Sequence, residues 1–158
     1  MDGIAMDVNS RLIFYTDTGY DEIGVINADT FVKTIVIDTN MDEPRAIVLD
    51  TQTREMFWTD WGANATIEKS NYDGSNRTTI VSTGLGWPNA MVLDGIKYEF
   101  VVITAGDLLI WCDAMKDVYE RVHRNGTGRT LLATLSGSHC FDFTIYEDDL
   151  YVNDWAYS

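Results

Sequence analysis

Few side chains in this chain have the type and spacing that chemistry requires. The chain has two histidines, His123 and His139, and two cysteines, Cys112 and Cys140. They do not stand at the spacing of a zinc site, and the sequence contains no nucleophile elbow, P-loop or EF-hand loop. The sequence therefore predicts a protein that is not an enzyme and uses no metal or cofactor. A role in sensing endosomal pH remains open for the histidines, with His139 the better candidate.

Aspartate is the reactive side chain that recurs at a regular spacing. It closes four similar tetrapeptides, about 40 to 50 residues apart, which are Phe14 to Asp17, Phe57 to Asp60, Ile110 to Asp113 and Tyr151 to Asp154. A short carboxylate at a strand end can accept hydrogen bonds from backbone N–H groups that would otherwise be unpaired. We predict this structural role for the four aspartates. The aromatic residues of the motif are predicted to pack in the core, namely Tyr15, Phe57, Trp58, Trp111 and Tyr151.

The segments that must position these aspartates are repeated as well. Residues 44–50 and 88–94 are alike, and residues 2–7 form a third copy shortly before the motif. Asp73-Gly74 and Asn125-Gly126 mark hairpin turns ahead of aliphatic runs. Each unit therefore predicts four short antiparallel strands, which make one blade of a β-propeller. A β-sandwich is the alternative, but it does not require the same residues at the same offsets.

Residues 44–94 show the repeat most completely. The pattern runs through Pro44 to Asp50, Met56 to Gly62, Ile67 to Lys69, Asp73 to Arg77 and Leu85 to Asn89. It resembles the YWTD repeats, or class B repeats, of the low-density lipoprotein receptor family, which form six-bladed propellers. The resemblance is greatest to the Wnt co-receptor branch of the receptor-related proteins, with nidogen second. It implies an all-β fold, a partial six-bladed YWTD β-propeller of about three and a half blades.

Length limits how much of a propeller is present. Six blades of ~43 residues would need ~260 residues, whereas this chain has 158. We expect a single partial domain, 1–158, with units near 2–43, 44–87, 88–139 and 140–158, and hence a fragment of a longer protein. The third unit has extra residues near 95–107, which could form a lengthened hairpin or a competing strand.

The fourth unit departs from the family pattern. Cys140, Val152 and Asn153 stand where the family usually has proline, tryptophan and threonine, so looser packing is expected there. Cys112 lies in the motif of the third unit. A bridge between Cys112 and Cys140 would join two blades and would require Cα atoms within ~7 Å. The interpretation that the sequence favours is two buried cysteines without a bridge.

Charge and sequons indicate an acidic extracellular module. The chain has 25 acidic and 11 basic residues and a net charge of -14, so it should repel nucleic acid and anionic membranes and attract basic partners. No signal peptide or membrane span is recognisable, so membrane contact would come only from segments outside this sequence. Asn64, Asn76 and Asn125 begin N-glycosylation sequons at predicted turns. A glycoprotein at the extracellular face of the plasma membrane, or a secreted one, is expected.

Five residues are candidates for ligand contact. Trp61 and Trp155 directly follow the motif aspartate, at a position where the other units have different residues. By resemblance this end of the strand faces ligand, and exposed tryptophan is a typical interface anchor. Trp87 in the turn between units and the acidic pair Asp42 and Glu43 complete the set.

The resemblance also implies the kind of function. It implies non-catalytic protein recognition by a receptor ectodomain, with Wnt proteins, Wnt antagonists or lipoprotein-type ligands as partners. One alternative is a nidogen-like basement-membrane scaffold that binds laminin. Another, from a different class, is a calcium-dependent lactonase, whose metal ligands would have to converge from several blades.

Overall fold

The computed structural model describes residues 1–94, 107–146 and 149–155, and every regular element in these ranges is a β-strand. The strands form three four-stranded sheets and one two-stranded sheet. The first contains β1 (Ile4–Asp7), β2 (Leu12–Asp17), β3 (Glu22–Asn27) and β4 (Lys33–Ile37). The second contains β5 (Pro44–Asp50), β6 (Glu55–Asp60), β7 (Thr66–Asn71) and β8 (Thr78–Val81). The third contains β9 (Pro88–Asp94), β10 (Leu108–Asp113), β11 (Val118–His123) and β12 (Thr130–Thr134), and the fourth contains β13 (Cys140–Tyr146) and β14 (Asp149–Asp154).

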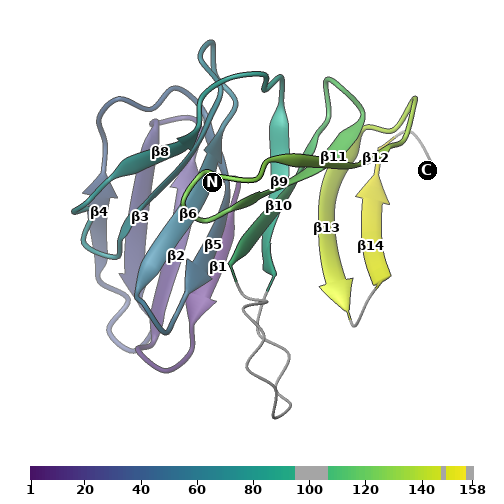
Figure 1. The fold of residues 1–158 in the computed structure, drawn as a ribbon. Helices are drawn as coiled ribbons and strands as arrows, with labels where there is room; N and C mark the ends of the chain where they lie inside the picture. Colours follow the sequence, from purple (N-terminus) through teal and green to yellow (C-terminus); the bar gives the residue numbers. More distant parts are fainter. Residues whose placement is uncertain (95–106, 147–148, 156–158) are drawn as a thin grey trace.

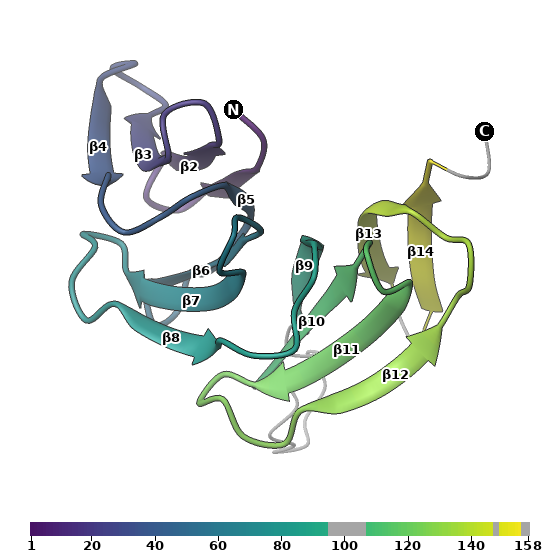
Figure 2. The same ribbon diagram turned by 90° about the horizontal axis from the view of Figure 1, so that it is seen from above.

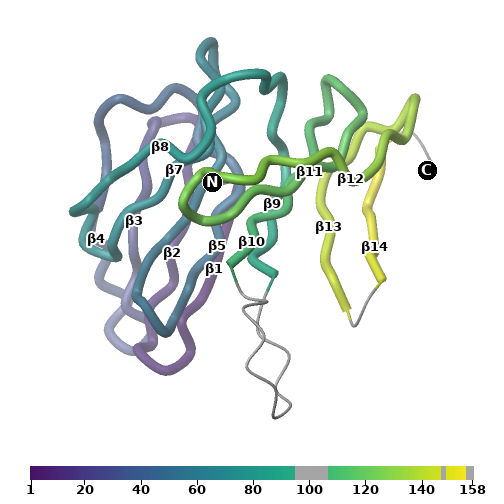
Figure 3. The backbone as a smooth tube through the Cα atoms, in the orientation of Figure 1, coloured from purple at the N-terminus to yellow at the C-terminus, as the bar shows by residue number. Residues whose placement is uncertain are grey.

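The sheets are arranged as the blades of a propeller. Neighbouring strands within a sheet are antiparallel and follow sequence order. The innermost strands β1, β5, β9 and β13 lie beside one another in that order, and the sheets fan out from them in an arc (Figures 1 and 2). The backbone passes from the outermost strand of one sheet to the innermost strand of the next (Figure 3). The predicted fold class, an all-β partial propeller, is confirmed.

The core lies between neighbouring sheets, because side chains alternate between the two faces of each strand. In β6, Met56 and Trp58 pack toward the first sheet, whereas Phe57 packs toward the third. In β10, Trp111 packs toward the second sheet and Cys112 toward the fourth. Each motif strand therefore contributes to two cores, and all five of these side chains are completely buried.

A cation from the turn before the outer strand covers the motif tryptophan of the second sheet. The guanidinium of Arg77 lies 5.4 Å from the ring centroid of Trp58 and pairs with Glu68. It also donates hydrogen bonds to the carbonyl oxygens of Thr39 and Asn40, in the linker from the first sheet. The Arg77 side chain thus links the Trp58 indole and Glu68 of its own sheet to the linker from the first sheet.

The third sheet repeats this arrangement. The guanidinium of Arg129 lies 5.2 Å from the ring centroid of Trp111 and pairs with Glu120. It donates to the carbonyl oxygens of Thr83 and Gly84 in the linker from the second sheet. The sequence interpretation did not anticipate this contact between sheets.

The turns follow the expected chemistry. Gly74 and Gly126 have φ values of 80° and 84° in the turns before β8 and β12, a region that glycine adopts readily. In the turns after β1 and β5, Asp7 and Asp50 accept hydrogen bonds at 2.8 to 3.3 Å from the N–H groups two and three residues further on. These carboxylates close the first hairpin of their sheets.

The two cysteines are joined, which corrects the expectation of unbridged thiols. Cys112 in β10 and Cys140 in β13 form a disulfide with Cα atoms 6.4 Å apart. Cys112 stands where the first two units have Thr16 and Thr59, and the Thr16 hydroxyl likewise reaches the next sheet by donating to the carbonyl oxygen of Arg45. The repeat therefore places this side chain beside the next inner strand, which the spacing of cysteines in the sequence could not reveal.

Tyr151 is a second correction. It was expected to pack in the core, but 54% of its surface is exposed. It holds the motif position of Phe14, Phe57 and Ile110, whose side chains pack toward the next sheet, and no sheet follows the fourth among the described residues. The predicted hairpin or strand near residues 95–107 falls almost entirely outside the described residues.

Candidate functional site

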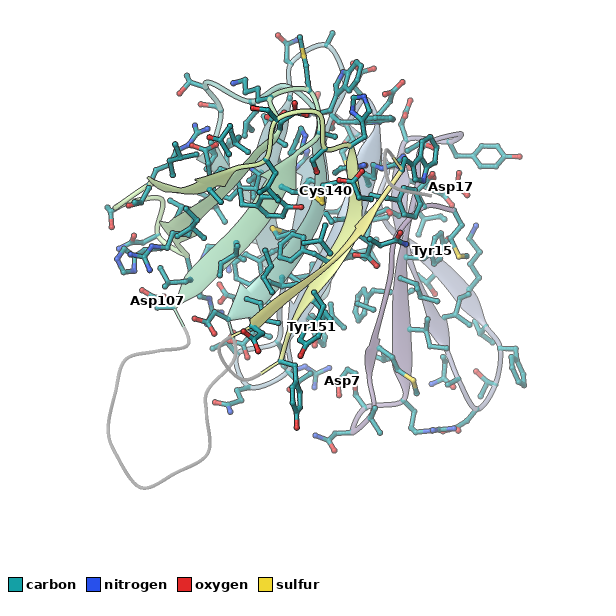
Figure 4. The ribbon with its side chains drawn as sticks, turned by 90° about the vertical axis from the view of Figure 1, so that its right-hand side faces the viewer. Asp7, Tyr15, Asp17, Asp107, Cys140 and Tyr151 are labelled. Carbon is teal, nitrogen blue, oxygen red and sulfur yellow. A yellow bond between two sulfur atoms is a disulfide. The ribbon has the colours of Figure 1, made fainter. Side chains whose placement is uncertain are left out.

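All four motif aspartates lie at the same end of the molecule. Because neighbouring strands are antiparallel, this end also carries the start of each inner strand and the loop between the second and third strands. We call it the aspartate face. Asp17 and Cys140 lie on it in Figure 4, and Asp7 lies at the opposite end.

The motif aspartates hold the linkers between sheets. Asp60 accepts hydrogen bonds from the N–H groups of Asp42 at 2.9 Å and Glu43 at 3.1 Å, just before β5. Asp113 accepts one from the N–H of Trp87 at 3.0 Å, just before β9. Both carboxylates are buried. The backbone that carries the Glu43 and Trp87 side chains is therefore fixed by the motif.

The other two aspartates act in related ways. Asp154 accepts a hydrogen bond from the N–H of His139 at 3.0 Å, just before β13. Asp17 accepts one from the N–H of Gly19 at 3.0 Å and pairs with the amino group of Met1 at 3.3 Å. In each sheet the motif carboxylate thus binds backbone on the aspartate face.

A cavity of about 520 Å³ lies on the aspartate face, and three positions of the repeat supply its lining. The residue before the inner strand gives Glu43, Trp87 and His139. The second residue of the inner strand gives Arg45, Asn89 and Phe141. The residue after the motif aspartate gives Trp61, Ala114 and Trp155. The repeat supplies the frame of the cavity, and side chains that differ between units supply its surface.

Four aromatic rings form two pairs around the cavity. Trp61 and Trp87 meet edge to face with ring centroids 6.1 Å apart, and Phe141 and Trp155 stack with centroids 5.4 Å apart. The Arg45 guanidinium lies 4.4 Å from the Trp61 centroid and 5.6 Å from that of Phe141. Arginine and aromatic side chains of this kind are the usual anchors of protein interfaces.

The polar side chains of the cavity include the Arg45 cation, the Glu43 carboxylate and the Asn89 amide, whose oxygen is buried without a donor among the described residues. Arg45 pairs with Asp2 at 3.9 Å, and 18% of its side chain is exposed. Burial lowers the pKa of Arg45, and the charges of Asp2 and Glu43 act in the opposite direction. Arginine remains charged nonetheless. The indole N–H of Trp61 is covered and has no acceptor among the described residues.

The structure brings four of the five predicted contact residues together. Trp61, Trp87, Trp155 and Glu43 line the cavity. Asp42 does not, because its carboxylate accepts a hydrogen bond from the N–H of Ala63 at 2.7 Å and supports the loop after β6. That these residues contact a ligand stays a prediction.

Sequence reasoning missed Ala114 and three residues at another position of the repeat. Arg45, Asn89 and Phe141 occupy one position of the repeat and differ in every unit. Variation at a fixed position had already pointed to Trp61 and Trp155. The same comparison at the second residue of the inner strand would have found the other three.

The two histidines lie at opposite ends of the molecule. His139 lines the cavity, with Nδ1 3.3 Å from the carbonyl oxygen of Ala114. His123 ends β11, with Nδ1 3.4 Å from an Asp107 carboxylate oxygen, at the end opposite the aspartate face. The histidine of interest for ligand binding is therefore His139, and pH sensing stays a prediction.

Comparison with known proteins identifies the repeat. The model of the family described as low-density lipoprotein receptor repeat class B matches residues 54–94. Residues 54–94 are a class B repeat. The matched segment begins just before β6 and ends with β9, so it includes the motif, the linker held by Asp113 and the next inner strand.

Similarity to known proteins extends along nearly the whole chain. A human low-density lipoprotein receptor-related protein 5-like protein is 33% identical over 156 residues, which is 99% of this chain and 58% of the relative. The Drosophila melanogaster vitellogenin receptor Yl is 30% identical over 97% of this chain and 7% of its own length. A chain in the crystal structure of a nidogen/laminin complex superimposes with a TM-score of 0.84 at 34% identity, covering 97% of this chain and 55% of that one. The chain thus spans little more than half of the human relative and of the superimposed chain.

The described ranges lack two kinds of feature. These residues contain no helix long and apolar enough to span a membrane. They also contain no group of three or more histidine, cysteine, aspartate or glutamate side chains placed to hold a metal ion.

Proposed function

We propose that this chain is part of an extracellular, non-catalytic propeller that binds protein ligands on the aspartate face. The observation that carries the proposal is the cavity, where two pairs of aromatic rings flank Arg45. A concave, mostly apolar site with a few convergent polar groups is what a protruding side chain or loop of a partner requires. Receptors and a protein from a nidogen/laminin complex among the relatives support this assignment.

The ligand class has a preferred and an alternative assignment. The preferred one is a receptor-related ectodomain that binds Wnt proteins, Wnt antagonists or lipoprotein-type ligands, and the human receptor-related relative supports it. The alternative is a basement-membrane scaffold that binds laminin, which the similarity to a chain from the nidogen/laminin complex favours.

The charges of this protein place one requirement on the overall charge of the ligand and another on the group that enters the cavity. The net charge of -14 favours approach of a partner that is basic overall. The Arg45 guanidinium lines the cavity and favours a ligand group that accepts hydrogen bonds there. A basic ligand that presents a carbonyl or carboxylate at the tip of a loop meets both requirements.

Surface plasmon resonance tests the proposal. The intact protein is immobilised and exposed to a laminin fragment and to secreted Wnt antagonists over a series of salt concentrations. We expect at least one class to bind, with an association rate that falls as salt rises, because exposed charges are screened beyond ~8 Å at physiological ionic strength. Failure of every candidate ligand to bind the folded protein would contradict the proposal.

A further inference from the structure

The structure separates the three sequons onto two faces. Asn64 lies in the loop between β6 and β7, on the aspartate face, whereas Asn76 and Asn125 lie in the turns before β8 and β12, at the opposite end. All three side chains are exposed. A glycan at Asn64 would therefore share a face with the aromatic cavity, and glycans at the other two positions would not.

The loop that carries Asn64 differs from its counterparts. It is one residue longer than the loops after β2 and β10, and in those two loops Asp21 and Asp117 adopt φ values of 52° and 57°. Hydrogen bonds to the Asp60 and Asp42 carboxylates anchor the Asn64 loop. The N–H of Gly62 donates to Asp60 at 3.1 Å, and the N–H of Ala63 donates to Asp42 at 2.7 Å. The next residue, Asn64, is thus presented from a fixed backbone.

Chain length limits how far Asn64 can be from the cavity. Trp61 lines the cavity, and Asn64 follows it by three residues. Since an extended chain spans at most ~3.6 Å per residue, the two Cα atoms lie within about 11 Å. An N-linked glycan is bulky and strongly hydrated, so its first sugars would stand beside the Trp61 and Trp87 pair.

We propose that Asn64 is a glycosylation site whose glycan acts as a steric filter on the aromatic cavity, admitting partners that insert a narrow loop and excluding flat protein surfaces. The inference rests on the proposed extracellular, ligand-binding function. In the modification, the Asn64 side-chain nitrogen forms a bond to the anomeric carbon of an oligosaccharide and loses one proton. The oligosaccharide leaves a lipid pyrophosphate donor.

Asn125 provides a matched control. It begins a sequon of the same kind, it is exposed, and its Oδ1 accepts hydrogen bonds from the N–H of Thr127 at 3.0 Å and from the Thr127 hydroxyl at 2.7 Å. Its position at the opposite end of the molecule leaves the cavity open. A glycan there adds the same mass and hydration without shielding Trp61.

Occupancy is the first test. The intact protein is secreted from mammalian cells, its glycans are removed enzymatically in heavy-oxygen water, and peptides are read by mass spectrometry. We expect Asn64 to be converted to labelled aspartate. An unmodified Asn64 beside a modified Asn125 would overturn the filter and leave the extracellular assignment intact. Absence of label at all three sequons in secreted, folded protein would overturn the filter and remove this support for the secretory route.

Shielding is the second test, and it does not depend on knowing the ligand. Hydroxyl-radical footprinting compares oxidation of Trp61 and Trp87 in the glycosylated protein, in Asn64→Gln and in Asn125→Gln. We expect a several-fold rise in oxidation at Trp61 in Asn64→Gln and no change in Asn125→Gln. Equal footprints in the two variants would overturn the inference. With the laminin fragment as probe, Asn64→Gln should also associate faster than Asn125→Gln, and equal association rates would count against the filter.

Discussion

At the scale of single residues, the motif aspartate connects the fold to the cavity. Asp60 accepts backbone N–H bonds from Asp42, Glu43 and Gly62 at 2.9 to 3.1 Å and is 5% exposed. Such a carboxylate satisfies donors that have no partner in a strand ladder. It fixes the linker before β5 and the loop after β6, and Glu43 and Trp61 on these segments line the cavity.

Replacing Asp60 with alanine should destabilise the protein by about 1–3 kcal/mol, because it leaves these N–H groups without their acceptor. Urea unfolding followed by fluorescence measures the loss. Asp29→Ala is the control, since Asp29 forms an exposed pair with Arg11 and its loss should cost ~0.5 kcal/mol or less. Equal effects of the two changes would mean that the motif carboxylate is not structural.

At the scale of the elements, neighbouring sheets are joined by side chains as well as by the core. Arg124, from the turn after β11, pairs with Asp50 at 2.7 Å and with Glu55 at 2.8 Å in the second sheet. Burial acts to raise the pKa of Asp50, but hydrogen bonds from Thr53 and neighbouring N–H groups and from Arg124 outweigh it and lower the pKa. Burial likewise acts to raise the pKa of Glu55, and Lys69, Thr53 and Arg124 lower it.

These lowered pKa values predict acid sensitivity. Because the folded pKa of each carboxyl is below its unfolded value, near 3.9 for Asp and 4.3 for Glu, the stabilisation is present above those values. It is lost as pH falls through the folded pKa. We expect the free energy of unfolding to decrease below about pH 4, and to decrease less steeply in Arg124→Ala. Denaturant titrations at several pH values measure both slopes, and parallel curves would contradict the role of Arg124.

The disulfide makes a second prediction at this scale. Cys112 and Cys140 are 28 residues apart in the sequence. For a loop of this length, a chain-entropy model assigns the bridge about 3–4 kcal/mol of stability. Cys112→Thr, combined with Cys140→Ala, restores the residue type that the first two units carry at position 112. The variant should unfold at lower urea concentration, and reducing agent should weaken the natural protein but not the variant. If the natural protein and the variant, each with and without reducing agent, share the same urea midpoint of unfolding, the bridge contributes nothing to stability.

At the scale of the whole molecule, the arc leaves apolar side chains uncovered at both of its ends. Ile4, Met6 and Ile35 are exposed on the first sheet, and Tyr146 and Tyr151 are exposed on the fourth. In a closed ring such faces lie between blades. Exposed strand edges and apolar faces favour association between molecules.

The isolated chain should therefore self-associate. Light scattering over a concentration series should give a mass that rises above that of the 17.9 kDa monomer. Addition of a mild detergent should reverse the rise, because it covers apolar surface. A stable monomer with one sharp unfolding transition would contradict this expectation.

The overall architecture could be predicted because the sequence pattern of one blade is repeated along the chain. Four copies of one motif reveal the blades, and the Asp-Gly and Asn-Gly turns were readable from local chemistry. The bridge between Cys112 and Cys140 could not be predicted, because it depends on the distance between adjacent inner strands. The exposure of Tyr151 depends on missing neighbours, which its own motif does not show.

The cavity was partly predictable for the same reason. Trp61 and Trp155 vary at a fixed repeat position, whereas the role of Arg45 depends on three sheets converging on one face. Asp42 was assigned to ligand contact from its charge, yet its carboxylate binds the N–H of Ala63 instead. The sequence alone does not distinguish a loop carboxylate that accepts a backbone hydrogen bond from one that is free to contact a ligand.

The central claim is that the aromatic cavity on the aspartate face anchors a protein ligand, and the dissociation rate of a Trp61→Ala variant tests it most directly. Surface plasmon resonance of the intact protein should show faster dissociation and a loss of about 2 kcal/mol or more of binding energy, with little change in association. Phe31→Ala is the matched control, since Phe31 is an exposed aromatic residue in the turn before β4, at the opposite end. If folded Trp61→Ala and Phe31→Ala release every ligand at the natural rate, the cavity is not the binding site.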